Sequence, residues 1–150
     1  MTEGLPGYAL AAGDGERLRF SDAEFLVLAS AATTGGAFTI IEEIAPVDTP
    51  RHVHEHEDEL FYVLEGEHVF EVGDGELRVG PGATVFAPRG VPHAHRRAVP
   101  RTGRFLTMTS PAGFEGFFRE LAEAEMRGTI GPEAYAHASE RYGVTWLDPG

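Results

Sequence analysis

Pro50-Arg-His-Val-His-Glu-His-Glu-Asp-Glu-Leu-Phe-Tyr-Val-Leu-Glu-Gly66 is the stretch in which this chain concentrates its chemistry. Side chains two residues apart in an extended segment point to the same side, so His52 and His54 can converge on one point. Glu59 can join them after a short turn, and the apolar strand expected over Leu60–Leu64 supports its carboxylate. Imidazole and carboxylate are ligands for divalent iron, manganese, nickel, cobalt and zinc, so the stretch indicates a metal site.

A second histidine group follows in Gly80-Pro-Gly-Ala-Thr-Val-Phe-Ala-Pro-Arg-Gly-Val-Pro-His-Ala-His95. The first stretch reads His-x-His-x4-Glu-x6-Gly, and the second reads Gly-x5-Pro-x-Gly-x2-His. Together they resemble the two motifs of the cupin family, with the similarity running from about Thr34 to Phe118. One departure is Arg97, which stands where an asparagine often follows the second motif. The matching positions are His52, His54, Glu59 and Gly66 in the first motif, and Gly82, Pro88, Gly90 and His93 in the second.

The resemblance, which is greatest to single-domain cupins of the quercetin-dioxygenase type, implies an all-β fold. The expected architecture is an antiparallel double-stranded β-helix, or jelly-roll barrel, over about residues 34–110 of one domain spanning 1–150. The resemblance also implies one divalent metal ion, which could be Fe, Mn, Ni, Co or Zn. Its implied ligands are His52, His54, Glu59 and His93.

Composition excludes several kinds of chemistry. The chain has no cysteine, which rules out disulfides, thiolate nucleophiles, iron–sulfur clusters and cysteine zinc sites. All 12 basic residues are arginine, so a lysine Schiff base is impossible, and the absence of asparagine removes N-glycosylation. At 150 residues, one compact domain is expected.

Charge and hydropathy bear on partners and location. The formal net charge is −12 and the arginines are scattered, which argues against a nucleic-acid partner. No apolar run reaches the length of a membrane span, and the N-terminus lacks the features of a signal peptide. We therefore expect a cytoplasmic protein that binds a small molecule and neither nucleic acid nor a membrane.

Short strands separated by glycine and proline clusters predict a β-barrel or sandwich. An N-terminal arm over residues 1–15 is expected to be ordered mainly by contact with something else. Residues 111–150 form the helical segment: Ser110-Pro111 predicts the start of a first helix ending at Gly128, and a second helix runs from Pro132 to Gly143. These helices, together with Trp146, should pack on the barrel. The expected strands are 17–20, 24–31, 37–45, 60–64, 67–72, 76–79, 83–87, 93–98 and 103–109, with a turn at 33–36.

Several residues near the motifs have two interpretations. His95 shares the inward face with His93 and is either a satisfied barrel histidine or a pocket residue that moves protons. We assign acid–base catalysis first to Glu59 and second to His95. His56 is expected at the surface or behind the ligands, and His68 and His137 are expected to be exposed or half-buried. Asp58 could brace a ligand histidine, although its place beside Glu59 points it to the opposite face.

The pocket wall is expected to include Phe61 and Val63, at even spacing from Glu59, while Tyr62 faces the other way. Phe114, Phe117 and Phe118 recur at helical spacing, as either an aromatic lid over the barrel mouth or ordinary packing. The predicted substrate-pocket set is Phe61, Val63, His95, Phe114, Phe117 and Phe118.

Three functions fit this sequence: a dioxygenase, a redox-neutral isomerase, cyclase or lyase, and a non-catalytic cupin that binds a small molecule. The resemblance favours the dioxygenase, acting on a small, metal-chelating, largely apolar or aromatic metabolite. A homodimer is expected, because open sheet edges invite pairing and the N-terminal arm lacks a reason to be ordered alone.

Overall fold

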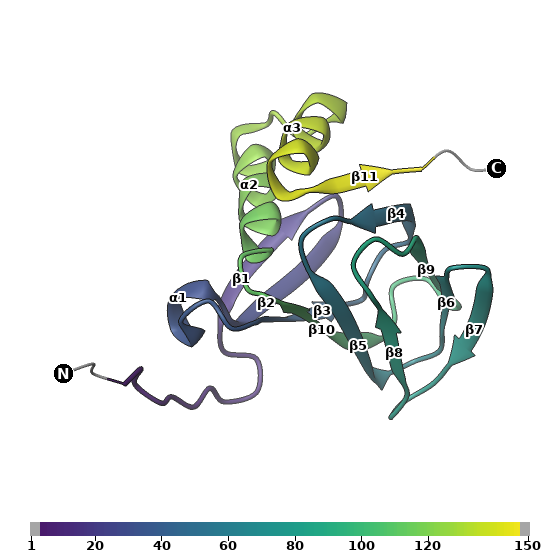
Figure 1. The fold of residues 1–150 in the computed structure, drawn as a ribbon, viewed down its shortest axis with the longest axis horizontal. Helices are drawn as coiled ribbons and strands as arrows, with labels where there is room; N and C mark the ends of the chain where they lie inside the picture. The colour runs from purple at the N-terminus through teal and green to yellow at the C-terminus, as the bar shows by residue number, and fades with distance from the viewer. Residues whose placement is uncertain (1–3, 148–150) are drawn as a thin grey trace.

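The computed structural model describes residues 4–147, which form two antiparallel sheets and three helices (Figure 1). The six-stranded sheet has the order β1-β2-β3-β10-β5-β8 and the five-stranded sheet the order β11-β4-β9-β6-β7. The first sheet contains β1 (Glu16–Phe20), β2 (Ala23–Ala29), β3 (Thr39–Ile44), β10 (Arg104–Ser110), β5 (Asp58–Glu65) and β8 (Thr84–Ala87). The second contains β11 (Val144–Trp146), β4 (Thr49–His54), β9 (His93–Arg97), β6 (His68–Val72) and β7 (Gly75–Val79). The helices are α1 (Ala31–Thr34), α2 (Glu115–Arg127) and α3 (Pro132–Tyr142).

From β3 to β10 the chain passes repeatedly between the two sheets, which is the topology of a double-stranded β-helix. β3, β5, β8 and β10 lie in one sheet, and β4, β6, β7 and β9 lie in the other. The predicted all-β jelly-roll barrel with two C-terminal helices is therefore confirmed. No helix within residues 4–147 is long and apolar enough to cross a membrane.

Strand β5 shows how the alternation of the sequence decides what faces the barrel interior. Glu59, Phe61 and Val63 are buried, whereas Tyr62 between them is 42% exposed. β5 pairs with β10 on one side and β8 on the other, so its inward row is fixed at both edges. A slip of one residue would turn the whole row outward, which makes this register strongly specified.

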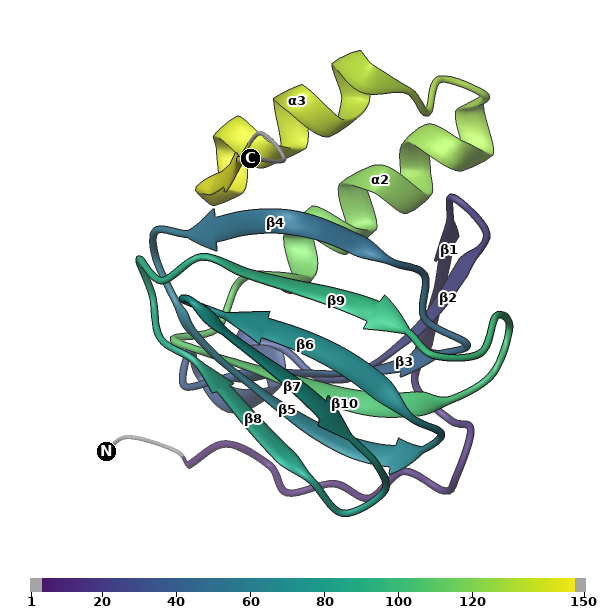
Figure 2. The same ribbon diagram turned by 90° about the vertical axis from the view of Figure 1, so that its right-hand side faces the viewer.

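The structure corrects three expectations about local elements. The first long helix begins at Glu115 with Phe114 at its N-cap, because Ser110 is still paired with Asp58 as the last residue of β10. Within the expected turn at 33–36, Thr33 and Thr34 end the one-turn helix α1, and Gly35 and Gly36 form the turn that follows it. The tail after α3 forms β11, in which Val144 pairs with His54. Figure 2 shows the result: α2 and α3 lie on the side of the barrel where β4 runs.

The hydrophobic core has two parts. One cluster fills the barrel around Phe61, Phe70 and Phe105. The other joins β1, β2 and β3 to the inward faces of α2 and α3, with Phe118 and Leu121 among its members. The helices are therefore part of the same packed unit as the barrel, as the sequence predicted.

The N-terminal arm follows the barrel surface without forming a helix or strand over residues 4–15 (Figure 1). The Tyr8 hydroxyl donates a hydrogen bond to the Leu28 carbonyl oxygen at 2.6 Å. Other apolar side chains of the arm, Leu5 and Leu10, are exposed. The homodimer stays a prediction, and the exposed Phe86 on the edge strand β8 offers an apolar contact for it.

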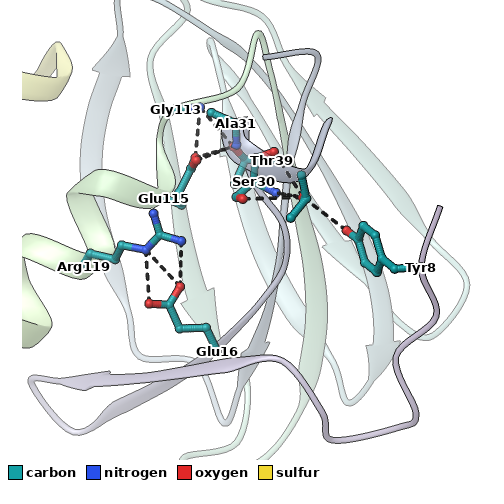
Figure 3. A network of polar contacts seen from close by, with 9 residues as sticks. Tyr8, Glu16, Ser30, Ala31, Thr39, Gly113, Glu115 and Arg119 are labelled. Atoms are coloured by element: carbon teal, nitrogen blue, oxygen red, sulfur yellow. Dashed lines mark hydrogen bonds and ion pairs between the residues drawn. The ribbon is translucent and has the colours of Figure 1, made fainter. Parts of the chain in front are cut away.

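The carboxylate of Glu115, only 3% exposed, joins α1, β3 and α2 (Figure 3). One oxygen accepts the Ala31 N–H at 2.7 Å, and the other accepts the Thr39 hydroxyl at 2.6 Å and the Gly113 N–H at 3.0 Å. Burial raises the pKa of Glu115, but these hydrogen bonds outweigh it and leave the pKa below its ordinary value. Nearby, Arg119 of α2 pairs with Glu16 of β1.

Replacing Glu115 with Gln should lower the free energy of unfolding by about 2 kcal/mol, since an amide NH₂ would face N–H and O–H donors. Because the folded-state pKa is depressed, this stabilisation is present above the ordinary carboxyl pKa and is lost as the pH falls through the folded value. Urea unfolding should show that the difference in stability between wild type and Glu115→Gln is smaller near pH 4 than at pH 7. Glu123→Gln, at an exposed position of α2, is the matched control and should change stability by less than about 0.5 kcal/mol. Equal stability of wild type and Glu115→Gln at pH 7 would contradict this role.

Candidate metal centre

The barrel brings together the four residues that the two motifs predicted. His52 and His54 come from β4, Glu59 from β5 and His93 from β9, and all are buried. One ligand atom from each lies within 4.8 Å of all the others. His52 is paired with His93 across β4 and β9 of one sheet, and β5 of the other sheet supplies Glu59, so donors from distant parts of the sequence meet at one point.

Each imidazole is oriented by an oxygen atom at Nδ1. The Nδ1 atom of His52 lies 2.7 Å from the Pro50 carbonyl oxygen, and that of His93 lies 3.3 Å from the Val91 carbonyl oxygen. The Nδ1 atom of His54 lies 2.7 Å from a carboxylate oxygen of Glu57. Because those oxygens accept a hydrogen bond from the Nδ1–H group, the neutral form of each ring carries its lone pair on Nε2, which is the form that ligates metals.

Within the described part of the chain, no side chain donates a hydrogen bond to these Nε2 lone pairs. The Nε2 atoms of His52 and His54 are 3.2 Å apart. When both neutral rings carry their proton on Nδ1, neither Nε2 can donate a hydrogen bond to the other. His93 Nε2 and Glu59 Oε2 lie 2.9 Å apart, and both are buried without a hydrogen-bond partner among residues 4–147. Donors that bind one ion at about 2.1 Å and at right angles are separated by about 3 Å. The donor set and its spacing therefore fit a single metal ion.

The electrostatics of the cluster favour the ligating protonation states of His52 and Glu59 but not that of His54. Burial, followed by the charge of His93, lowers the pKa of His52 to about 4. Burial raises the pKa of Glu59, but the surrounding histidines outweigh it and lower the value to about 2. For His54, burial lowers the pKa, while Glu59 and Glu57 reverse the effect and leave it raised. The carboxylate of Glu59 is thus ionised at neutral pH, as a metal ligand must be.

Glu57 is a functional residue that the sequence reasoning did not identify. It is 6% exposed, and its carboxylate orients the ring of His54. Asp58, which the sequence suggests as a brace for a ligand histidine, instead accepts hydrogen bonds from Arg89 outside the cluster. The chain bends at Glu55 and His56, which interrupts the strand alternation and turns Glu57 inward.

Glu57→Gln should weaken metal affinity by about 10- to 100-fold, because the amide orients His54 less strongly and makes its ring less basic. Competition with a chromophoric chelator measures this directly. Glu55→Gln, an exposed neighbour, serves as control and should bind metal like the wild type. The double variant His52→Ala/His93→Ala should bind none, and stoichiometric metal in it would overturn the ligand assignment.

The cluster opens into a cavity of about 480 Å³ between the barrel and the C-terminal helices. Phe61 and the three expected aromatic residues of α2 and its N-cap line it. Phe114 also contacts His54, with ring centroids 4.5 Å apart. Val63 is not part of this wall; it is fully buried in the adjacent barrel cluster. The lining aromatic residues from the expected set are Phe61, Phe114, Phe117 and Phe118.

His95 lines the same cavity and is paired with His68. Their ring atoms His68 Nδ1 and His95 Nε2 lie 3.0 Å apart. The expectation that His68 is exposed or half-buried is wrong: it is 1% exposed, because His68 begins β6 on its inward row. Burial and the neighbouring His68 lower the pKa of His95 to about 4.

The remaining histidines lie outside the cluster. His56 is exposed, and its ring covers Gly143, where an added Cβ would lie 2.4 Å from the ring. Gly143 ends α3 with φ +72, so both its conformation and this contact require glycine. His137 is exposed on α3, as expected.

Several cavity residues had no signal in the motifs. The C-terminal strand places Trp146 beside His52, with ring centroids 4.9 Å apart. β1 and β2 supply further rings, and β3 supplies a carboxylate. The lining residues that the sequence reasoning missed include Phe20, Phe25, Glu43, Phe105, Tyr135 and Trp146.

A double-stranded β-helix with three histidines and one glutamate converging inside it defines a metal-binding barrel protein. A family model described as the cupin domain matches residues 40–109, which include both motifs. The chain belongs to the cupin superfamily.

Comparison with individual proteins gives further similarities. The chain is 30% identical over 128 residues, 82% of its length, to quercetin 2,3-dioxygenase of Bacillus subtilis (strain 168), and it spans 37% of that enzyme. The polyketide cyclase RemF from Streptomyces resistomycificus matches with a TM-score of 0.59 and 25% identity, over 70% of this chain and 80% of that chain. KdgF from Halomonas sp. shares the fold, with a TM-score of 0.64 and 17% identity, over 74% of this chain and 99% of that chain.

Proposed function

We propose that this protein is a metal-dependent enzyme of the dioxygenase type that acts on a small aromatic compound with adjacent oxygen atoms able to chelate a metal. The observation that carries this proposal is the cavity itself, in which aromatic rings enclose the open side of a three-histidine, one-carboxylate cluster. A volume of about 480 Å³ falls in the range of small-molecule sites. The similarity to quercetin 2,3-dioxygenase supports the reaction type.

The proposed mechanism gives each part of the chain a task. His52, His54, Glu59 and His93 would hold one divalent ion, which supplies coordination positions for substrate oxygen and dioxygen and acts as a Lewis acid. The rings of Phe114 and Phe117 would stack with the substrate and exclude water. Glu59 would accept the proton of the substrate hydroxyl, since its carboxylate is ionised at neutral pH.

A redox-neutral cyclase is the second candidate, favoured by the similarity to the polyketide cyclase RemF. It would use the same cluster and cavity, with the ion as Lewis acid and Glu59 or His95 moving the proton. The two functions differ in one reactant, because only the dioxygenase consumes oxygen.

Oxygen uptake should distinguish the two functions in protein loaded separately with Fe, Mn, Ni, Co and Zn. With quercetin as a chelating aromatic probe, we expect uptake that depends on the metal and stops when it is removed by chelation. Glu59→Gln should keep much of the metal and lose turnover by at least about 100-fold. His95→Phe should mainly change the pH dependence or substrate preference.

Product formed without oxygen uptake would favour the cyclase. A metal-loaded protein that turns over no compound of a broad aromatic panel would contradict both proposals and indicate a binding protein. Near-normal turnover in metal-loaded Glu59→Gln would place the base elsewhere, with His95 as the next candidate.

A further inference from the structure

Glu43 is a carboxyl group in the cavity wall, outside the metal cluster and its immediate supports. It lies on β3, the strand between β2 and β10, where it pairs with Phe25 on one side and Phe105 on the other. Both of these phenylalanines also line the cavity. Glu43 is half-buried and itself lines the cavity, so its polar end faces the enclosed space.

One hydrogen bond fixes this carboxyl group. The Thr107 hydroxyl donates to Glu43 Oε2 at 2.5 Å. Thr107 pairs with Ile41, two residues before Glu43, so the carboxyl group leans along β3 toward the end of the sheet that carries Glu59. Within residues 4–147 no other group donates to it, which leaves Oε1 available to a molecule in the cavity.

A carboxyl group in an apolar wall with one partner is costly, since a carboxylate offers about four acceptor sites and its burial is compensated only by hydrogen bonds. Burial is the main cause that raises the pKa of Glu43 to about 7, with Thr107 acting against it and the charge of Glu59 adding to it. The group therefore exists near neutral pH both as an acid that donates and as a carboxylate that accepts. Other residues with polar groups that line the cavity are Ser21, Asp48, Thr49, His52, His54, Glu59, His93, His95, Tyr135 and Trp146.

We propose that Glu43, held by Thr107, is a second ligand-binding subsite that hydrogen-bonds a hydroxyl group of the bound aromatic compound away from the metal. The inference rests on the proposed function for the aromatic nature of the ligand, and it adds a requirement for a hydroxyl group outside the chelating pair. An aromatic compound would thus be bound at one end by the ion and at another by Glu43. Replacing this carboxyl group should change which compounds bind without changing the metal content.

The test uses 2-naphthol and naphthalene, which differ in one hydroxyl group and have no chelating pair of oxygens. Calorimetric titration of zinc-loaded wild type should give about tenfold tighter binding of 2-naphthol. Glu43→Leu should reduce this preference to within about twofold while naphthalene affinity and metal content stay unchanged. Thr107→Val should reduce it partly, and Glu42→Gln, on the outward face beside it, should leave it intact.

Glu43→Gln keeps the shape of the side chain and can still form hydrogen bonds through its amide, so it should retain part of the preference for 2-naphthol. It also keeps the test conclusive if Glu43→Leu fails to fold. An unchanged preference in folded Glu43→Leu, no preference in the wild type, or no binding of either compound would overturn the subsite. Oxygen uptake is measured separately. Its absence alongside a Glu43-dependent preference would reject the dioxygenase and retain the subsite.

Discussion

The structure depends on the orientation of three buried imidazoles by oxygen atoms at their Nδ1 positions. The two carbonyl acceptors are close in sequence to the histidines that they orient. Pro50 lies on β4 with His52, and Val91 lies two residues before His93, the first residue of β9. The third acceptor, Glu57, is a carboxylate from the bend between β4 and β5. Without these contacts the rings would be free to turn their protonated nitrogens inward and lose the common point. The register of β4 with β9 and the packing of β5 from the other sheet serve this arrangement.

The interior of the barrel is polar near the cluster of three histidines and one glutamate and apolar further along the strands. The inward rows near the cluster carry histidine and glutamate, while the rows further along β5 and β10 carry Phe61, Val63 and Phe105. The cavity lies where these two regions meet the aromatic faces of the helices. A ligand there contacts apolar rings on most sides and polar groups at a few fixed points, which is how small-molecule sites obtain both affinity and orientation.

The sequence predicted the four ligands and the barrel through the resemblance of its two motifs to those of the cupin family. Local spacing alone indicates that His52 and His54 share a face, because alternate residues of a strand point to the same side. It did not separate Glu42 from Glu43, since Ile40-Ile41-Glu42-Glu43-Ile44 has no alternation from which the inward glutamate can be chosen. Glu57 was missed because two bend residues interrupt the strand period. β11 was missed because three residues are too few to show a period, and its partner β4 lies about ninety positions earlier in the chain. The burial of His68 depends on a contact with His95, again from a distant strand.

The segment that covers the cavity is attached to the barrel at both of its ends. At its start, Glu115 is hydrogen-bonded to α1 and β3. At its end, Val144–Trp146 pair with β4, the strand that carries His52 and His54 (Figure 1). A helical cover hinged at one end could swing open as a rigid body, but here such a swing would separate β11 from β4. The helices therefore form a fixed wall of the cavity, and the β1–β2 hairpin is joined to them as well, through the rings of Phe20 and Phe25 and the Ser21–Tyr135 contact.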